Sequence, residues 1–509
     1  MTNLSRRTAL GAIGITAVGA IGYQLRTQEA ARTVTAPTRP APRTGSNAVV
    51  RENAETGSQD WVIGHRDTIG ANDAAAQIQG YASKTSVDPG ESVDFHIWSH
   101  VAQTCTVAIY RIGHYGGAGA RHLSTSRAVA VEPRTRPTSD PTTGLIACDW
   151  PVSWTLEIPR TWISGLFLAV FTSEDGFRSY TPFVVRDTSR RSDVLMVVPF
   201  TTYQAYNLWP SDGRIGKNLY KGFTPDGKLG ANPERAFRVS FDRPYAHTGL
   251  PSWFEMDTSA ARWAEESGYD ITYASSVDLH EGGLDPTEYT AVIFSGHDEY
   301  WSADMRQWAE KAVEEGTHLA FLGSNNIYFH IRIEASGDGR DGRVVTCYKQ
   351  DEDPEPGPDG PTERWRTLGK KHKKAEQGLL GVQYNGMLAE PVPLVVQESS
   401  HWFWAGSGLR DGDQIPDLIA VEADGFNPSM PRPQDSEQTL LSASPYDDSM
   451  GRGRRVQNTS LCENTRKTMV FVAGTFYWPL ALNEPEHLNP RVQRATTNLL
   501  SEMLKRYSA

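Results

Sequence analysis

Residues 193–199 read DVLMVVP, and the residues after Asp193 form a continuous apolar run that differs from the sequence before it. A run without alternation is typical of a strand buried on both faces, as in a parallel sheet covered by helices. Runs of the same kind follow at 291–294 (AVIF) and 318–322 (HLAFL), and residues 302–315 between them carry apolar side chains at helical spacing. This alternation predicts an α/β domain with a mainly parallel sheet.

The sequence upstream has the pattern of antiparallel strands. Residues 92–98 (SVDFHIW) and 105–112 (CTVAIYRI) alternate apolar and polar side chains. Short alternating strands between Pro, Gly and Ser turns are typical of an antiparallel β-sandwich. We therefore predict a sandwich domain at 75–187, followed by an α/β domain at 188–509 with a long irregular insertion around 340–460.

The N-terminus has the features of a targeting segment. A polar start with Arg6 and Arg7 precedes a short apolar run rich in Gly and Ala, which resembles a twin-arginine export signal. The alternative is an ordinary membrane anchor. We predict a signal or anchor at 1–31 and a flexible linker and lead-in at 32–74. Both interpretations place the body of the protein outside the cytoplasm, in the periplasm, the cell envelope or the medium.

Composition excludes several classes of protein. The 509 residues suffice for two or three domains, and a net charge of −11 argues against a nucleic-acid partner. No later segment is long and apolar enough to span a bilayer. Four cysteines are too few for a disulfide scaffold. Outside the cytoplasm Cys105 could pair with Cys148 and Cys347 with Cys462, or all four could be buried thiols.

Polar segments rich in aromatic residues follow three of the predicted strands. They are FTTYQAYNLWP at 200–210, SGHDEYW at 295–301 and GSNNIYF at 323–329. Ligands bind beyond the carboxyl ends of the strands in open α/β sheets, so we expect these segments to meet at one rim. For SGHDEYW the alternative is helix capping by Asp298 or Ser302 without a function.

Common catalytic motifs are missing. The sequence has no G-x-S-x-G elbow, no H-E-x-x-H zinc motif and no phosphate-binding G-x-x-x-x-G-K-[ST] loop. None of the three junctions carries a cysteine nucleophile. The predicted rim offers mostly Tyr, Asp, Glu and Asn, whereas zinc sites prefer clustered His or Cys.

Several segments together resemble the large subunit of N,N-dimethylformamidase and its relatives. The resemblance covers roughly residues 75–480 and rests on IYRIGHYGG at 109–117, AYN at 205–207, NLY at 218–220, GHDEYW at 296–301 and GSNNIYF at 323–329. It implies an α/β domain similar to glutamine-amidotransferase folds but without their catalytic cysteine. Asn325 stands where that nucleophile would be expected.

The resemblance also implies a mononuclear iron, as Fe(III), held by two tyrosines and one glutamate. By motif, Glu299 is the carboxylate ligand and Tyr206 and Tyr220 are the tyrosines, with Tyr203 as the competitor of Tyr206. Phenolates and carboxylates are hard oxygen donors, which favour a hard trivalent ion. Such an ion would act as a Lewis acid on an amide carbonyl.

Further residues carry over around this metal site. His297 and Asn325 resemble family residues that orient substrate or water, and Asn326 could replace Asn325. A general base is also needed, and Glu422 is our candidate, with Asp424 as the nearest alternative.

The sequence thus predicts an exported, metal-dependent hydrolase of the C–N bond of a small amide. The export signal departs from the amidase, which works inside the cell, and leaves the substrate open. A homo-oligomer and the family's small partner subunit also stay open. The alternative is a non-catalytic exported protein that binds carbohydrate or another envelope polymer, which the 14 Trp and 19 Tyr residues would suit.

Overall fold

The computed structural model describes residues 40, 43, 45–65, 68–368 and 374–505. The predicted signal or anchor at 1–31 lies outside the described residues, as does the first part of the predicted linker. Later in that linker, helix α1 (Ala48–Asn53) begins after Asn47, whose side chain accepts a hydrogen bond from the Val50 amide. The C-terminal part of the predicted linker therefore contains regular structure.

Two β-sheets are built from the strands between residues 69 and 185. These strands are β1 (Ile69–Gly70), β2 (Gln79–Ala82), β3 (Ser86–Val87), β4 (Ser92–Trp98), β5 (Gln103–Ile112), β6 (Ala120–Thr125), β7 (Val129–Val131), β8 (Trp154–Glu157), β9 (Gly165–Ser173) and β10 (Phe177–Val185). The larger sheet has the order β1-β10-β9-β5-β6, with β3 beside β10 and β7 beside β5, and the smaller has the order β2-β4-β8. The long strands pair antiparallel, whereas β1 and β3 run parallel to β10.

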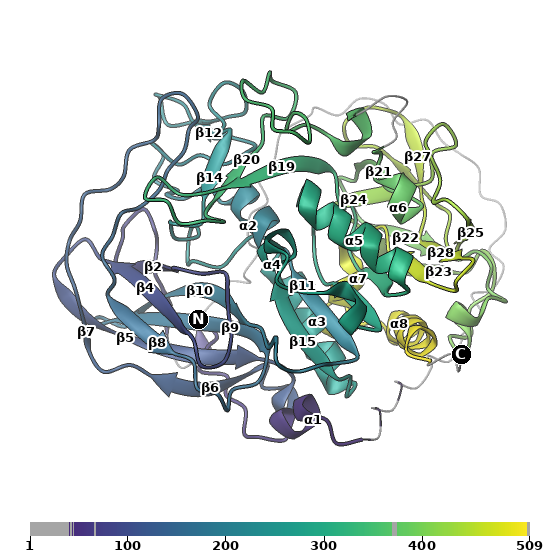
Figure 1. The fold of residues 1–509 in the computed structure, drawn as a ribbon, viewed down its shortest axis with the longest axis horizontal. Coiled ribbons are helices and arrows are strands. Elements are labelled where there is room, and N and C mark those ends of the chain that lie inside the picture. Colours follow the sequence, from purple (N-terminus) through teal and green to yellow (C-terminus); the bar gives the residue numbers. More distant parts are fainter. Residues whose placement is uncertain (1–39, 41–42, 44, 66–67, 369–373, 506–509) are drawn as a thin grey trace, which may run out of the picture. The chain divides into compact units, whose positions relative to one another are not determined.

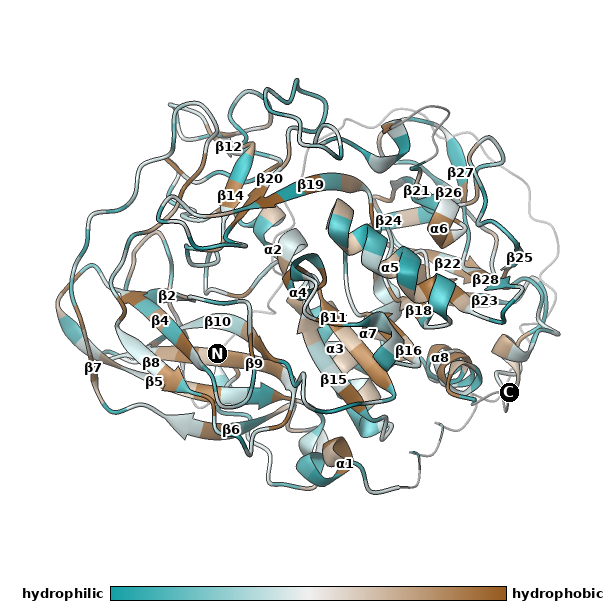
Figure 2. Cartoon of the chain, viewed as in Figure 1, coloured by the Kyte–Doolittle hydropathy of each residue, from teal (hydrophilic) through white to brown (hydrophobic). Residues whose placement is uncertain are grey.

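The larger of these sheets is buried on both faces. Along β9, Phe167, Ala169 and Phe171 belong to a hydrophobic cluster shared with the smaller sheet. The alternate residues Leu166 and Leu168 belong to a second cluster, which also contains residues of the α/β region. Successive side chains of a strand point to opposite faces, so one sheet contributes to two cores. This explains why the run from Leu166 to Phe171 in β9 is apolar at every position (Figure 2).

A second seven-stranded sheet forms the centre of the remaining chain. Its strands are β11 (Val194–Val198), β15 (Ile271–Ser275), β16 (Ala291–Phe294), β18 (His318–Phe321), β25 (Ser436–Leu440), β28 (Ser460–Asn464) and β29 (Met469–Val472). The order is β15-β11-β16-β18-β29-β28-β25. The first five strands are parallel, and β28 and β25 add to one edge in antiparallel pairs. The three apolar runs singled out in the sequence are the neighbouring strands β11, β16 and β18.

Helices accompany this sheet. They are α2 (Phe200–Tyr206), α3 (Phe254–Glu266), α4 (Ser276–Glu281), α5 (Ala303–Glu315), α6 (Gln377–Leu380), α7 (Tyr477–Asn483) and α8 (Pro490–Met503). Figure 1 shows α3 and α4 next to β11 and β15. The predicted helix at 302–315 is α5, which Ser302 caps through a hydrogen bond from the Met305 amide and which ends at Gly316 in a left-handed conformation. The fold is thus a mixture of α and β structure with many strands in several sheets.

The other strands are short and lie in small sheets. They are β12 (Gly222–Phe223), β13 (Leu229–Gly230), β14 (Arg238–Ser240), β17 (Tyr300–Ser302), β19 (Phe329–Glu334), β20 (Val344–Thr346), β21 (Gln383–Met387), β22 (Val392–Val395), β23 (Gln414–Ile419), β24 (Glu422–Gly425), β26 (Ser444–Asp447) and β27 (Arg454–Gln457). The region around 340–460, which the sequence predicts to be irregular, therefore contains a series of short paired strands.

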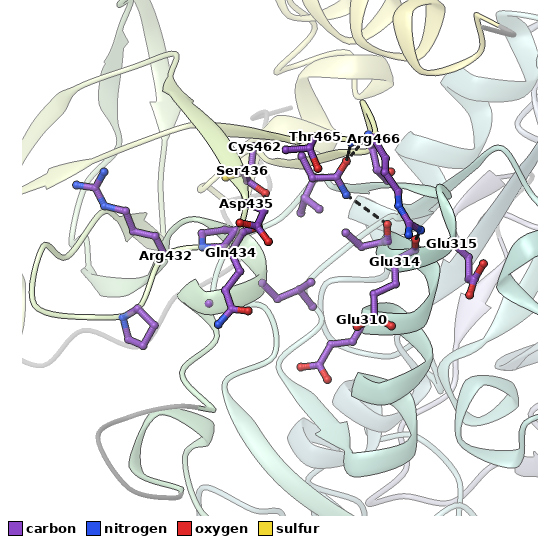
Figure 3. A pocket seen from close by; sticks show the side chains of 18 of the residues that line it. Glu310, Glu314, Glu315, Arg432, Gln434, Asp435, Ser436, Cys462, Thr465 and Arg466 are labelled. Atoms are coloured by element: carbon purple, nitrogen blue, oxygen red, sulfur yellow. Dashed lines mark hydrogen bonds between the residues drawn. The ribbon is translucent and has the colours of Figure 1, made fainter. Parts of the chain in front are cut away.

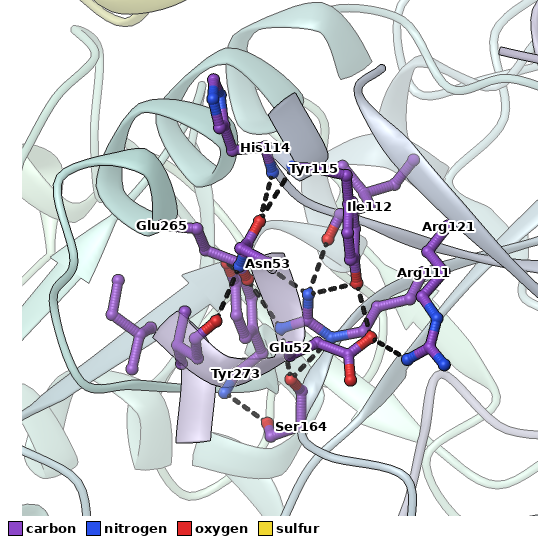
Figure 4. Close-up of polar contacts among 12 residues, drawn as sticks. Glu52, Asn53, Arg111, Ile112, His114, Tyr115, Arg121, Ser164, Glu265 and Tyr273 are labelled. Carbon is purple, nitrogen blue, oxygen red and sulfur yellow. Dashed lines mark hydrogen bonds and ion pairs between the residues drawn. The ribbon is translucent and has the colours of Figure 1, made fainter. Parts of the chain in front are cut away.

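A buried ion pair joins the first sheet to α3. Arg111 of β5 binds the Glu265 carboxylate through two nitrogens, at 2.7 and 2.9 Å, and both side chains are buried. Tyr273 donates a further hydrogen bond to Glu265 at 2.8 Å, and Tyr115 lies 2.9 Å from the guanidinium (Figure 4). Burial lowers the pKa of Arg111, but the Glu265 carboxylate outweighs this and raises it. Protein groups therefore satisfy both charges.

All four cysteines are buried free thiols. Cys105 and Cys148 lie in different hydrophobic clusters, as do Cys347 and Cys462. The disulfides that the sequence left open are therefore not formed in this structure. Among the described residues, no helix combines the length and the apolar character needed to cross a membrane.

Candidate functional site

The three polar segments meet at the carboxyl ends of neighbouring strands, as the sequence predicts. Helix α2 follows β11 and ends at Tyr206, while His297 and Glu299 follow β16. Asn325 lies in the turn after β18. Because β11, β16 and β18 are adjacent and parallel, these side chains reach one rim of the sheet.

Two tyrosines and one glutamate form the centre of the site. Tyr206 donates a hydrogen bond to one Glu299 oxygen at 2.8 Å, and the Tyr220 hydroxyl lies 2.6 and 2.7 Å from the two carboxylate oxygens. The two hydroxyl oxygens are 3.0 Å apart, and the rings stack with centroids separated by 4.6 Å. Burial and the Glu299 carboxylate raise the pKa of both phenols. Three oxygen donors therefore converge on one point.

His297 adjoins this group. Its Nε2 atom lies 3.2 Å from the Tyr206 hydroxyl and 3.3 Å from a Glu299 oxygen. Its Nδ1 atom is 3.2 Å from the Ser324 carbonyl oxygen, which fixes the plane of the ring. Burial lowers the pKa of His297, but the Glu299 and Glu422 carboxylates outweigh burial and raise it. Burial raises the pKa of Glu299, but the hydrogen bond and charge of His297 outweigh burial and lower it.

Tyr203 takes no part in this group. Its hydroxyl donates to Asp257 of α3 at 2.5 Å, inside the hydrophobic core. Residues three apart are neighbours on a helix surface, yet the two hydroxyl groups have different partners, Asp257 for Tyr203 and Glu299 for Tyr206. Of the two tyrosines that the sequence left as alternatives, the structure places Tyr206 beside Glu299.

Asn325 connects the rim to Glu422. Its side-chain amide donates to a Glu422 oxygen at 2.9 Å, and its backbone amide donates to Asp424 at 2.8 Å. Asn325 has φ of 56°, in the left-handed region that Asn tolerates better than most residues. Glu422 is the first residue of strand β24. The pKa of Glu422 is raised to about 7, mainly by burial. The charge of His297 acts to lower this pKa, and the Glu299 carboxylate acts to raise it.

Several polar atoms at the rim have no hydrogen-bond partner within the described part of the chain. They include the side-chain oxygen of Asn325, both polar side-chain atoms of Asn326 and both carboxylate oxygens of Asp298. All three residues are buried. Buried polar groups are nearly always satisfied in proteins, so such a concentration is typical of a place where water or a ligand binds. The Asn326 side chain thus makes no hydrogen bond to Glu422 among the described residues, whereas that of Asn325 does.

Sequence reasoning missed Lys349. Its ammonium nitrogen lies 3.2 Å from the centre of the Tyr220 ring and 4.6 Å from that of Phe329. Burial lowers its pKa to about 7, although Glu299 acts in the opposite direction. The only signal in the sequence was a lysine directly after the apolar run VVTCY at 344–348, inside the region predicted to be irregular.

A known family covers the part of the chain that builds this candidate site. A family model described as "N,N-dimethylformamidase beta subunit-like, C-terminal" matches residues 106–492. The chain belongs to this family. The matched part of this dimethylformamidase-like chain includes all three rim segments and the strands that position them.

Other comparisons add little. No curated protein matches the dimethylformamidase-like chain. A superoxide reductase (neelaredoxin) from Ignicoccus hospitalis is 11% identical over 21% of this chain and 78% of its own, with a TM-score of 0.13. A cycloisomaltooligosaccharide glucanotransferase from Paenibacillus sp. is 10% identical over 62% of this chain and 61% of its own, with a TM-score of 0.17. Neither likeness supports an argument about fold or function.

Other parts of the chain offer weaker candidates. Within the described ranges, no group of three or more His, Cys, Asp or Glu side chains is placed to hold a metal ion. The Tyr206–Tyr220–Glu299 group differs because two of its donors are phenols. A cavity of about 570 Å³ lies elsewhere, with Glu310 and Glu314 of α5 on one side and Arg432 on the other (Figure 3). None of the predicted site residues lines it.

Proposed function

We propose that this chain is a metal-dependent hydrolase of the C–N bond of a small amide. Family membership supports amide hydrolysis. The observation that carries the proposal is the convergence of the Tyr206, Tyr220 and Glu299 oxygens within about 3 Å of one another at the rim of the parallel sheet. The rival interpretation, a binding protein for carbohydrate or an envelope polymer, has no comparable support from the family.

The donor set fits a mononuclear ferric ion. All three donors are hard oxygen atoms, and as phenolates and carboxylate they would carry three negative charges. Tyr206, Tyr220 and Glu299 would hold the ion, and the three donors leave room for substrate. When bound, the ion would supply Lewis-acid polarisation of the amide carbonyl and a lower pKa for the attacking water.

The protein groups around this centre would handle the protons. Glu422, as general base, would take a proton from the attacking water and return it to the nitrogen of the leaving amine. The Asn325 amide, 2.9 Å from a Glu422 oxygen, would hold that carboxylate in position. His297 would orient the reacting groups beside Glu299. The Phe476 ring, whose centroid lies 4.4 Å from that of His297, would keep bulk water from this side of the site.

We further propose the finer organisation and location that the sequence suggests. Residues 75–187 would be a β-sandwich domain and residues 188–509 an α/β domain of the glutamine-amidotransferase-like type. The first 31 residues would direct export through the twin-arginine route, so that the protein works in the periplasm, the cell envelope or the medium. The substrate would then be a small amide met outside the cytoplasm.

Metal analysis together with a visible spectrum tests the proposal. The purified full chain should contain about one iron per chain and show a broad tyrosinate-to-iron charge-transfer band, and it should release amine from small formamides. Tyr220→Phe and Glu299→Ala should lose the band and the iron. Wild-type protein without iron and without the band, or variants with full occupancy, would contradict the metal site.

A further inference from the structure

A second pocket lies next to the candidate site, between the start of α3 and the helix α7. Its volume is about 260 Å³, and its aromatic walls are Trp253, Phe476 and Tyr477. Ligand pockets in proteins are usually about 300–1,000 Å³, so this one suits a small ligand. Trp253 packs edge-to-face on Phe476 with centroids 5.2 Å apart, so the aromatic walls support one another.

The pocket also carries negative charge. Glu255, Glu484 and Glu486 line it, and no Lys or Arg is among its lining residues. Just outside, Arg262 lies 3.7 Å from a Glu484 oxygen and offsets one of the three charges. The only other titratable neighbours in the lining are the His487 imidazole, whose ring lies 4.6 Å from that of Tyr477, and the Tyr477 phenol itself. At neutral pH the pocket is therefore net negative.

We propose that this pocket binds a small organic ammonium ion. A cation over the face of Trp, Tyr or Phe is attracted by the negative face of the ring, and this attraction grows when water is excluded. Carboxylates at the edge of an aromatic pocket add a Coulomb attraction that a neutral ligand does not receive. Burial and repulsion from the Glu484 carboxylate raise the pKa of Glu255. A bound cation would relieve the repulsion between the two carboxylates.

The position of the pocket connects it to amide hydrolysis, and this part of the inference rests on the proposed function. Phe476 is shared, because it lines the pocket and its ring centroid lies 4.4 Å from that of His297. Cleavage of an amide gives a carboxylic acid and an amine, and an aliphatic amine takes up a proton at neutral pH. The ammonium ion is thus either the released amine or a cationic group on the far end of the substrate.

Direct binding tests the pocket without any need for activity. The purified full chain is titrated with choline and with its neutral isostere 3,3-dimethylbutan-1-ol, by calorimetry and by Trp fluorescence. We expect saturable choline binding and at least about tenfold weaker binding of the isostere, as cation–π and Coulomb attraction predict. Equal affinities, or no choline binding at millimolar concentration, would overturn the proposal.

Variants locate the bound ion. Glu255→Gln and Glu486→Gln each remove one carboxylate from the pocket lining and should each weaken choline binding by about threefold or more. Trp253→Leu should weaken it further. The matched control is Glu437→Gln, an exposed carboxylate on β25 away from the pocket, which should bind choline as wild type does. Unchanged affinity in both pocket variants would place the ion elsewhere and reject the assignment.

Two further experiments distinguish whether the bound ion is the released amine or part of the substrate. If the ion is the released amine, dimethylammonium should displace choline and inhibit hydrolysis. If the ion belongs to the substrate, an amide with a trimethylammonium group should have a lower KM than its neutral isostere, and Glu255→Gln should remove the difference. If the chain binds choline but hydrolyses no amide, the ammonium-binding pocket is supported and only the proposed function is contradicted.

Discussion

Tyr203 and Tyr206 lie three residues apart on α2, and their hydroxyl groups reach different carboxylates. Tyr203 donates to Asp257 in the core, at 2.5 Å, and Tyr206 donates to Glu299 at the rim, at 2.8 Å. Two chemically identical side chains on one short helix therefore differ in their partners, so that one has a structural role and the other a candidate ligand role.

This relationship predicts opposite outcomes for two matched substitutions. Tyr206→Phe removes one of the three converging oxygens, so we expect metal content and the visible charge-transfer band to fall at least about tenfold, since outer-shell changes alone can cost that much. Tyr203→Phe should keep both and should instead lower the unfolding temperature, because Asp257 loses a hydrogen bond in the core. Loss of the metal in Tyr203→Phe alone would reverse the assignment of the two tyrosines.

The pH dependence of hydrolysis should report Glu422. Its pKa of about 7 means that the free carboxylate, which is the form that accepts a proton, grows in population as pH rises through 7. A cation bound nearby lowers this pKa, so we expect the rate to rise with pH and to level off at or below about pH 7. Glu422→Gln should lower kcat by about 10²–10⁴-fold, the usual contribution of a general base.

Asp424→Asn serves as the comparison for that variant. Asp424 accepts the Asn325 backbone amide, so its loss should disturb the position of Asn325 and reduce the rate less. The rising limb of the pH profile should persist in Asp424→Asn and disappear in Glu422→Gln. The opposite pattern would make Asp424 the general base.

The Arg111–Glu265 pair should be essential for stability. Arg111→Met leaves the Glu265 carboxylate buried with no cation, and breaking a buried pair in this way costs about 3–5 kcal/mol. Arg191→Met is the control, because Arg191 is 82% exposed and pairs with Glu288 only at the surface. We expect the control to change the free energy of unfolding by less than about 1 kcal/mol in urea denaturation. Equal effects of the two substitutions would contradict this interpretation of the pair.

Asp257 should make stability depend on pH. Burial raises its pKa to about 7, although Ser295 and Tyr203 donate to it and lower the pKa. Between about pH 4 and 7 the folded state therefore keeps a proton that the unfolded state has released, so the free energy of unfolding falls as pH rises, by up to about 1.4 kcal/mol per pH unit for this proton. Asp257→Asn should flatten that slope in thermal unfolding between pH 5 and 7. An unchanged slope would mean that Asp257 is ionised in the folded protein.

The sequence by itself determined three strands of the central sheet and the rim at which the segments after them meet. The apolar runs at 194–198, 291–294 and 318–321 are the neighbouring parallel strands β11, β16 and β18. Local patterns sufficed because burial on both faces requires apolar side chains at every position of a strand. The rim followed from the topology, since the carboxyl ends of parallel strands meet at one edge.

Only the tertiary structure decided which side chains meet. It separated Tyr203 from Tyr206, joined Asn325 to Glu422 and placed Lys349 over the Tyr220 ring. These contacts connect residues that are far apart along the chain, and no local pattern records the distance between them.

The packing of the cysteines and of the two hydrophobic clusters around β9 also could not be predicted from local sequence. Nothing in the spacing of the cysteines shows that the members of each candidate pair lie in different hydrophobic clusters. Likewise, β9 carries apolar side chains on both faces because a different hydrophobic cluster packs against each face. The sequence of the strand does not show what packs against it. Packing between distant elements fixes which atoms touch, and it depends on the whole chain at once.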